Sequence, residues 1–75
     1  MSNPDEHVQE FSSVTEQELQ IAENYETEIK NAGATHLSTH RCENHPNTLY
    51  IWGPTPTAVE QATTKYTQLQ NKHTE

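Results

Sequence analysis

The chain has 75 residues, of which only 29% are hydrophobic, and its formal net charge at pH 7 is −7. A chain of this length forms one small domain at most. The composition excludes a membrane-spanning helix, which needs a run of about 18 apolar residues. It also excludes a disulfide framework, because Cys42 is the only cysteine. The polar, acidic first residues do not resemble a signal peptide, and we expect a cytoplasmic protein.

The charge is unevenly distributed along the chain. Eight of the eleven acidic residues lie within residues 1–28, which contain no lysine or arginine. Binding to nucleic acid or to an anionic membrane needs basic side chains that neutralise phosphate. We therefore expect neither a membrane nor direct nucleic acid as a partner. The acidic part of the chain favours a basic protein instead, and a nucleic-acid-handling protein is one such partner.

Residues 1–12 are polar and acidic, with Val8 and Phe11 as isolated hydrophobic residues. Such a segment is typical of a flexible terminus. We therefore predict an acidic tail over residues 1–12, a single α+β domain over residues 13–72 and a short tail over residues 73–75.

The first predicted helix begins after Thr15, which forms a capping box with Glu18. Apolar residues at helical spacing continue to Ala32, and Gly33 follows where a helix commonly ends. The sequence therefore predicts one helix of about 16–18 residues. Its outward side is acidic, and we predict that a basic protein binds three glutamates that lie away from the apolar stripe: Glu16, Glu23 and Glu28.

Residues 35–42 and 48–52 are rich in threonine and aromatic residues, which predicts two strands joined by a turn over residues 43–47. A second helix follows, with Thr55 as its N-cap and Pro56 as its first residue. Its apolar stripe consists of Val59, Ala62, Tyr66 and Leu69. The predicted fold is thus helix-strand-strand-helix with a two-stranded antiparallel hairpin. Because a two-stranded sheet is marginal alone, we expect a homodimer to complete it.

The second predicted strand alternates between two faces of the sheet. If Leu49 and Ile51 face the helices, Tyr50 and Trp52 face the opposite side. Aromatic side chains are enriched in protein interfaces. We therefore predict that Tyr50 and Trp52 bind a partner.

The densest group of potential metal ligands surrounds the predicted turn. His40 and Cys42 share one face of a strand at about 6.6 Å spacing, and His45 follows in the turn. With a fourth group they would suit tetrahedral zinc, although the spacing matches no common zinc finger. The preferred prediction is no cofactor. We also predict no catalytic residues and no enzyme activity, because the chain has no glycine-rich loop and no feature that points to an oxyanion hole.

The stretch LYIWGPTPTAVEQA, residues 49–62, resembles the closing strand and helix of KH domains. In that family a hydrophobic strand ends in glycine and leads into a helix with Val-x-x-Ala spacing. The resemblance covers about 55 residues, because the preceding helix and strand come in the matching order. The predicted elements include no first strand, and the chain has no Gly-x-x-Gly loop, which in KH domains clamps the nucleic-acid backbone. The resemblance therefore implies no nucleic-acid-binding residue here.

The sequence is consistent with three functions. The first is a small, acidic, non-catalytic protein-binding module, homodimeric, that serves as an adaptor or inhibitor of a basic protein. The second is a small metal-binding protein that uses His40, Cys42 and His45. The third is a degenerate KH-like module that binds nucleic acid.

Overall fold

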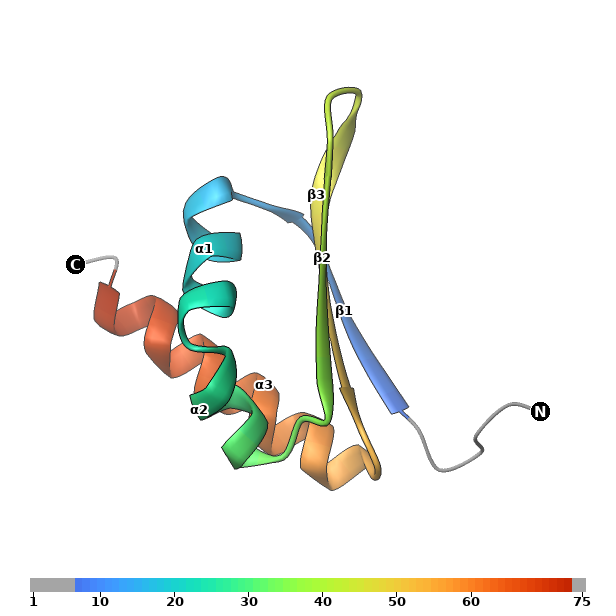
Figure 1. Ribbon diagram of the computed structural model, residues 1–75, viewed down its shortest axis with the longest axis vertical. Coiled ribbons are helices and arrows are strands. Elements are labelled where there is room, and N and C mark those ends of the chain that lie inside the picture. The colour runs from blue at the N-terminus through green and yellow to red at the C-terminus, as the bar shows by residue number, and fades with distance from the viewer. Residues whose placement is uncertain (1–6, 74–75) are drawn as a thin grey trace.

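The computed structural model describes residues 7–73, except for the side chain of Cys42. These residues form a three-stranded antiparallel sheet with the strand order β1-β3-β2, and three helices. All three helices lie on one side of the sheet (Figure 1). The predicted α+β class is therefore confirmed. The elements are β1 His7–Val14, α1 Glu16–Asn24, α2 Glu26–Ala32, β2 His36–Cys42, β3 His45–Gly53 and α3 Pro56–His73.

Strand β1 is the main difference from the sequence prediction. Residues 7–12, predicted as part of a flexible tail, pair with the central strand β3 from His7 opposite Gly53 to Ser12 opposite Thr48. Ser13 has a positive φ of 59°, and the register shifts between Ser12 and Val14. This bulge turns Val14 to the same side of the sheet as Phe11, although the two residues are three apart. The sheet therefore has three strands rather than two, and residues 1–6 lie outside the described residues.

The predicted first helix is divided in two. Its start is confirmed, since Thr15 Oγ1 accepts a 3.1 Å hydrogen bond from the Glu18 backbone N–H and Glu18 Oε1 accepts one of 2.7 Å from the Thr15 N–H. The prediction of a single helix is wrong. Tyr25 has φ −114° and ψ 25°, outside the helical region, and separates α1 from α2. The Tyr25 ring lies 5.0 Å from the ring of His73, at the end of α3.

The hydrophobic core lies between the sheet and the helices. Leu49 and Ile51 of β3 are 0% exposed, as are Leu19 of α1 and Ile29 of α2. Helix α3 contributes its whole predicted stripe, and Tyr66 at its centre is fully buried. The Tyr66 hydroxyl donates to the Glu18 carbonyl oxygen at 3.2 Å and accepts from Gln70 Nε2 at 2.9 Å. Burial raises the pKa of Tyr66 to about 12.

Two glycines allow other parts of the chain to pack closely against the first turn of α3. Gly33 ends α2 with a φ of 153°, and a Cβ atom there would overlap the backbone carbonyl of Ala58 in α3. A Cβ atom on Gly53 would lie 2.9 Å from Val59 Cγ2. The N-cap of α3 next to this junction is as predicted, since Thr55 Oγ1 accepts a 3.1 Å hydrogen bond from the Ala58 N–H. Glycine is thus needed at position 33 for both conformation and space.

The hairpin turn between β2 and β3 is shorter than predicted. Cys42 is paired with His45, so only Glu43 and Asn44 remain between the strands. Pro46 falls within β3, close to a register shift between His40 and Cys42. Proline lacks an N–H group and cannot donate a hydrogen bond to the neighbouring strand, so it is tolerated where the pairing of the strands is irregular. The outer end of the hairpin projects past the helices (Figure 1).

Candidate protein-binding surface

One side of the sheet is covered by the helices, and the other is not (Figure 1). Leu49 and Ile51 point towards the helices, so the alternate residues of β3 and their partners on β1 and β2 point to the opposite side. We call this side the open face. It contains three residues from each strand: Val8, Glu10 and Ser12; Thr48, Tyr50 and Trp52; and His36, Ser38 and His40.

Aromatic side chains occupy the centre of the open face. The rings of Tyr50 and Trp52 are 6.3 Å apart, and the His40 ring meets Tyr50 edge-on at 5.5 Å. The sequence prediction that both aromatic residues face away from the helices is confirmed. Val8 lies across from Trp52 and is 46% exposed, which makes it the one exposed large hydrophobic residue in the described part of the chain. Sequence reasoning missed Val8, because it lies in a segment with no period-two pattern.

Short-range hydrogen bonds hold the polar residues on either side of the aromatic centre. On β1, Ser12 Oγ donates to Glu10 Oε2 at 3.3 Å. On β2, the Ser38 hydroxyl and His36 Nε2 are 3.1 Å apart. Both contacts lie within a single strand and are exposed to solvent, so these side chains are free to exchange them for contacts with a partner.

The predicted metal ligands lie around the end of the hairpin. His40 is paired with Thr48 in the β ladder, and Cys42 is paired with His45. Residues 7–73 contain no group of three or more histidine, cysteine or acidic side chains that could hold a metal ion, but the side chain of Cys42 lies outside this description. Zinc binding by His40, Cys42 and His45 therefore stays a prediction.

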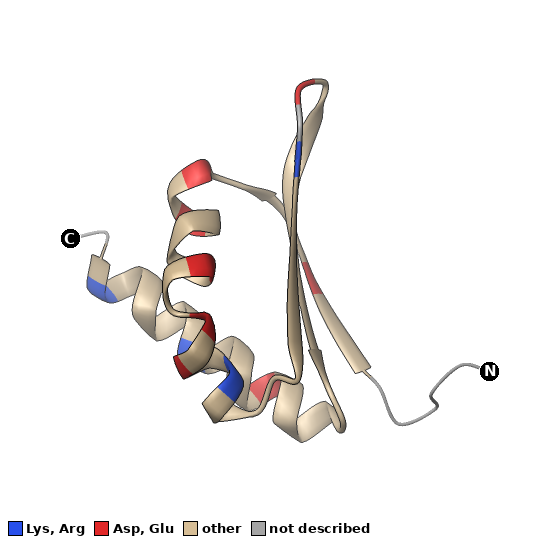
Figure 2. Cartoon of the chain, viewed as in Figure 1, with Lys and Arg blue, Asp and Glu red and all other residues tan. Residues whose placement is uncertain are grey.

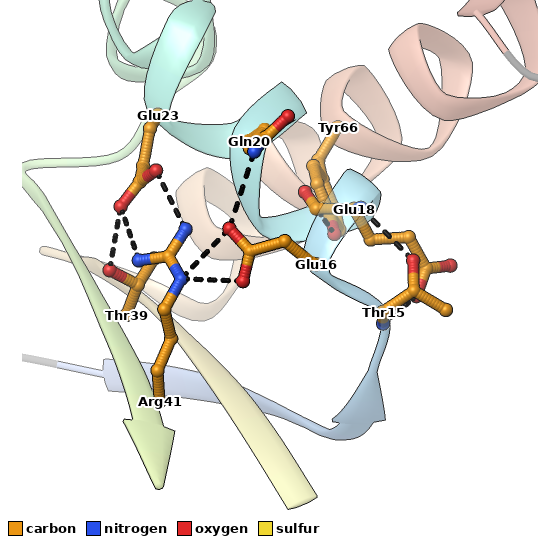
Figure 3. Close-up of polar contacts among 8 residues, drawn as sticks. All are labelled: Thr15, Glu16, Glu18, Gln20, Glu23, Thr39, Arg41 and Tyr66. Atoms are coloured by element: carbon orange, nitrogen blue, oxygen red, sulfur yellow. Dashed lines mark hydrogen bonds and ion pairs between the residues drawn. The ribbon is translucent and has the colours of Figure 1, made fainter. Parts of the chain in front are cut away.

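Two of the predicted partner-binding glutamates contact Arg41 of the same chain. Arg41 Nε donates to both carboxylate oxygens of Glu16, at 2.7 and 3.0 Å (Figure 3). Its Nη1 and Nη2 each donate to one oxygen of Glu23 at 2.9 Å, and Thr39 Oγ1 donates to Glu23 at 3.1 Å. Arg41 points to the helical side of β2, so these contacts join the hairpin to α1. We call this group the Arg41 cluster.

The Arg41 cluster changes the interpretation of the acidic helix. Hydrogen bonds from Arg41 hold the pKa values of Glu16 and Glu23 below their usual range, and the same contacts raise the pKa of Arg41. Glu16 and Glu23 remain 52% and 43% exposed. Both were predicted to bind a basic protein, whereas each already has an intramolecular basic partner in Arg41. Glu28, the third predicted glutamate, lies in the first turn of α2.

A groove lies between α1–α2 and β2. It is lined by Ala22, Glu23 and Glu26 of the helices and by Leu37 and Thr39 of the strand. Lys30 Nζ lies 3.0 Å from Glu26 Oε2, and Arg41 binds Glu23 as described above. Each carboxylate of the groove is thus paired with a basic side chain, so the groove is close to neutral.

Comparison with known proteins identifies no relative, since we find no matching family model, no similar curated protein and no similar solved structure. None of the helices within residues 7–73 is long and apolar enough to cross a membrane. Any interpretation of function therefore depends on the geometry of the molecule.

Proposed function

We propose that this protein is a small, non-catalytic protein-binding module, an adaptor or inhibitor, and that the open face is its binding surface. One observation supports the proposal above others: the open face has a partly exposed aromatic centre, and none of the helices of residues 7–73 packs on this side of the sheet (Figure 1). Clustered Tyr and Trp side chains beside an exposed aliphatic residue are typical of the residues that dominate binding energy in protein interfaces.

The charge of the open face favours a protein over a nucleic acid. A sheet that stacks bases on its aromatic residues also needs lysine or arginine to bind phosphate. Lys30, Lys65 and Lys72 lie on helices, and Arg41 faces the helical side. The open face has instead one carboxylate, Glu10, and two histidines. Aromatic residues without basic neighbours suit a protein surface.

We also propose that the arrangement of elements is that of a KH-like scaffold without nucleic-acid function. The sequence resemblance lacked a first strand, and β1 is a strand in that position. The chain still contains no Gly-x-x-Gly loop; its two glycines are Gly33 and Gly53. A salt-sensitive complex with RNA would contradict this interpretation.

Composition and charge support two further parts of the proposal, a cytoplasmic location and a basic protein as a second partner. A single cysteine, Cys42, fits a reducing cytoplasm. The acidic residues of α1 and α2 lie on the side of the molecule away from the open face, on the helices drawn with red segments in Figure 2. This acidic side stays the predicted contact for a basic protein, with Glu28 as its residue outside the Arg41 cluster.

The binding surface can be tested by site-specific photo-cross-linking in an extract of the source organism. We expect a cross-linker at Ser12 or Ser38 of the open face to capture the same protein, and one at Gln61 or Gln68, on the exposed side of α3, to capture none. The matched control is Tyr50→Ser, which should abolish capture while the domain stays folded. Equal capture from all four positions would contradict the proposal, as would products that a nuclease removes.

A further inference from the structure

The open face contains few charged residues, so a second copy could approach it without strong repulsion. Helices α1 and α2 contain five glutamates and Lys30, α3 contains Glu60, Lys65 and Lys72, and the hairpin turn contains Glu43. Among the described residues of the open face, Glu10 is the only carboxylate. Figure 2 shows this distribution, with most red segments on the helices and one on β1. A chain of net charge −7 can therefore approach a second copy through the open face at a low electrostatic cost.

The register of the strands arranges the open face as a three-by-three grid. Tyr50 is at its centre, between Glu10 on β1 and Ser38 on β2. One row away, Trp52 lies between Val8 and His36. On the other side of Tyr50, Thr48 lies between Ser12 and His40. The carboxylate is thus on one edge of the face, and the two imidazoles are on the other edge, one row above and one row below it.

We propose that a second copy of this chain occupies the open face, and this proposal rests on the function proposed above. The two copies are related by a two-fold axis that runs parallel to β3. This operation lays β1 of each copy over β2 of the other and keeps every row at its own level. Glu10 of one copy then lies over Ser38 of the other, with His36 and His40 about 7 Å away on either side along the strand. Tyr50 meets Tyr50, and Val8 meets His36.

Charge complementarity selects this axis over the alternative. A two-fold axis perpendicular to the strands would lay β1 over β1, so that Glu10 faced Glu10 and the histidines faced each other. In the proposed arrangement an imidazole N–H donates to a carboxylate, which is a favourable contact for the charged ring and for the neutral ring. Packed sheets lie about 10 Å apart, a distance that a glutamate and a histidine can span together.

The size of the open face sets the expected affinity. Its grid is about 15 Å wide and 17 Å long, well below the roughly 800 Å² per partner of a standard interface. We therefore expect a weak dimer with a dissociation constant on the order of 10–100 μM. Such a dimer would leave the open face partly free at low concentration for another protein.

The arrangement can be tested by exchanging the charged groups between the two edges of the open face and measuring self-association by sedimentation equilibrium. The full chain is used at about 10–500 μM in low salt. Glu10→Lys alone, and His36→Glu with His40→Glu, should each weaken self-association at least tenfold. The variant with all three substitutions should recover to within about threefold of the wild type, because the carboxylate and the basic groups have exchanged edges. Its formal net charge is again −7, since the change at position 10 adds two charges and each histidine change removes one.

The matched control is Glu28→Lys on α2, which changes net charge as Glu10→Lys does but lies on the helical side. It should leave self-association unchanged or slightly stronger. Failure of the triple variant to recover would overturn the proposed axis. A wild-type chain that stays monomeric at 500 μM would overturn the second copy as occupant, and capture of another protein at Ser12 and Ser38 would then leave the proposed function intact. A dimer indifferent to both Glu10→Lys and Tyr50→Ser would form through another surface and would also overturn the second copy as occupant of the open face, whereas the cross-linking experiment still decides the proposed function.

Discussion

The two faces of the sheet differ in burial although the same three strands form both. Along β3, Leu49 and Ile51 are fully buried against the helices, whereas Tyr50 and Trp52 remain partly exposed. The larger, aromatic residues of this strand are thus on the uncovered face. Along β3, the aliphatic side chains thus pack in the core and the aromatic ones lie on the face proposed to bind a partner. We therefore expect substitutions on the covered face to lower the free energy of unfolding, and substitutions on the open face to weaken association.

The largest expected effect is on the covered face. Ile51→Ala deletes a fully buried side chain and leaves a cavity in the core cluster that also contains Leu19, Ile29 and Tyr66. We expect the free energy of unfolding to fall by about 2–4 kcal/mol, a large part of the stability of a small domain. Urea denaturation followed by circular dichroism measures the change. A loss no greater than that of the open-face variant Tyr50→Ser would contradict the comparison.

The contact between the end of α2 and the start of α3 should be the next most sensitive position. Gly33→Ala forces a Cβ atom against the Ala58 carbonyl and places alanine at a φ of 153°. We expect a loss of about 1–3 kcal/mol from the conformation alone, with the overlap adding to it. Thermal unfolding measures the effect, and Asn31→Ala, at an exposed position near the end of α2, is the control. Equal stability of the two variants would show that α2 and α3 move apart at little cost.

Substitution of the N-cap of α1 should lower the free energy of unfolding by an intermediate amount. Thr15→Ala removes the hydroxyl that accepts from the Glu18 N–H and leaves that donor to solvent. Loss of such a cap costs about 1 kcal/mol, which should appear in the urea midpoint without a change in slope. Thr27→Ala, at an exposed position within α2, is the matched control and should be close to neutral.

The Arg41 cluster should affect the pH dependence of stability more than stability at neutral pH. The folded pKa values of Glu16 and Glu23 are lowered by Arg41, from a usual value of 4.5. The unfolded state therefore binds more protons near this pH, so the contribution of the cluster is present above pH 4.5 and is lost as pH falls through the folded values. Arg41→Gln should give a shallower fall in melting temperature between pH 6 and pH 3. Glu28→Gln is the control and should keep the wild-type profile.

The sequence pattern alone predicts the features that depend on residues close together in the chain, such as helix caps and apolar stripes. The capping box at Thr15, the N-cap at Thr55 and the stripe that includes Val59 and Tyr66 are all as predicted. The outward direction of Tyr50 also follows from alternation alone.

The elements that sequence reasoning missed depend on tertiary contacts. Strand β1 has no period-two pattern, because the bulge at Ser13 places Phe11 and Val14 on one side although they are three residues apart. The helix break at Tyr25 has no glycine or proline to mark it. The pairing of Arg41 with Glu16 spans 25 positions, a distance that no helical or strand period describes.

The smallest effect on stability is expected on the open face. Tyr50 is only partly buried, and its neighbours on the adjacent strands are Glu10 and Ser38, so Tyr50→Ser removes less buried area than Ile51→Ala. We expect the free energy of unfolding of the monomer to change by no more than about 1 kcal/mol. Self-association should nevertheless be lost, because Tyr50 lies on the proposed axis and meets its own copy. Urea denaturation at low micromolar concentration measures the first quantity and sedimentation equilibrium the second. A variant that unfolds far more easily than the wild type would place Tyr50 in the core, and the distinction between a folding face and a binding face would then be wrong.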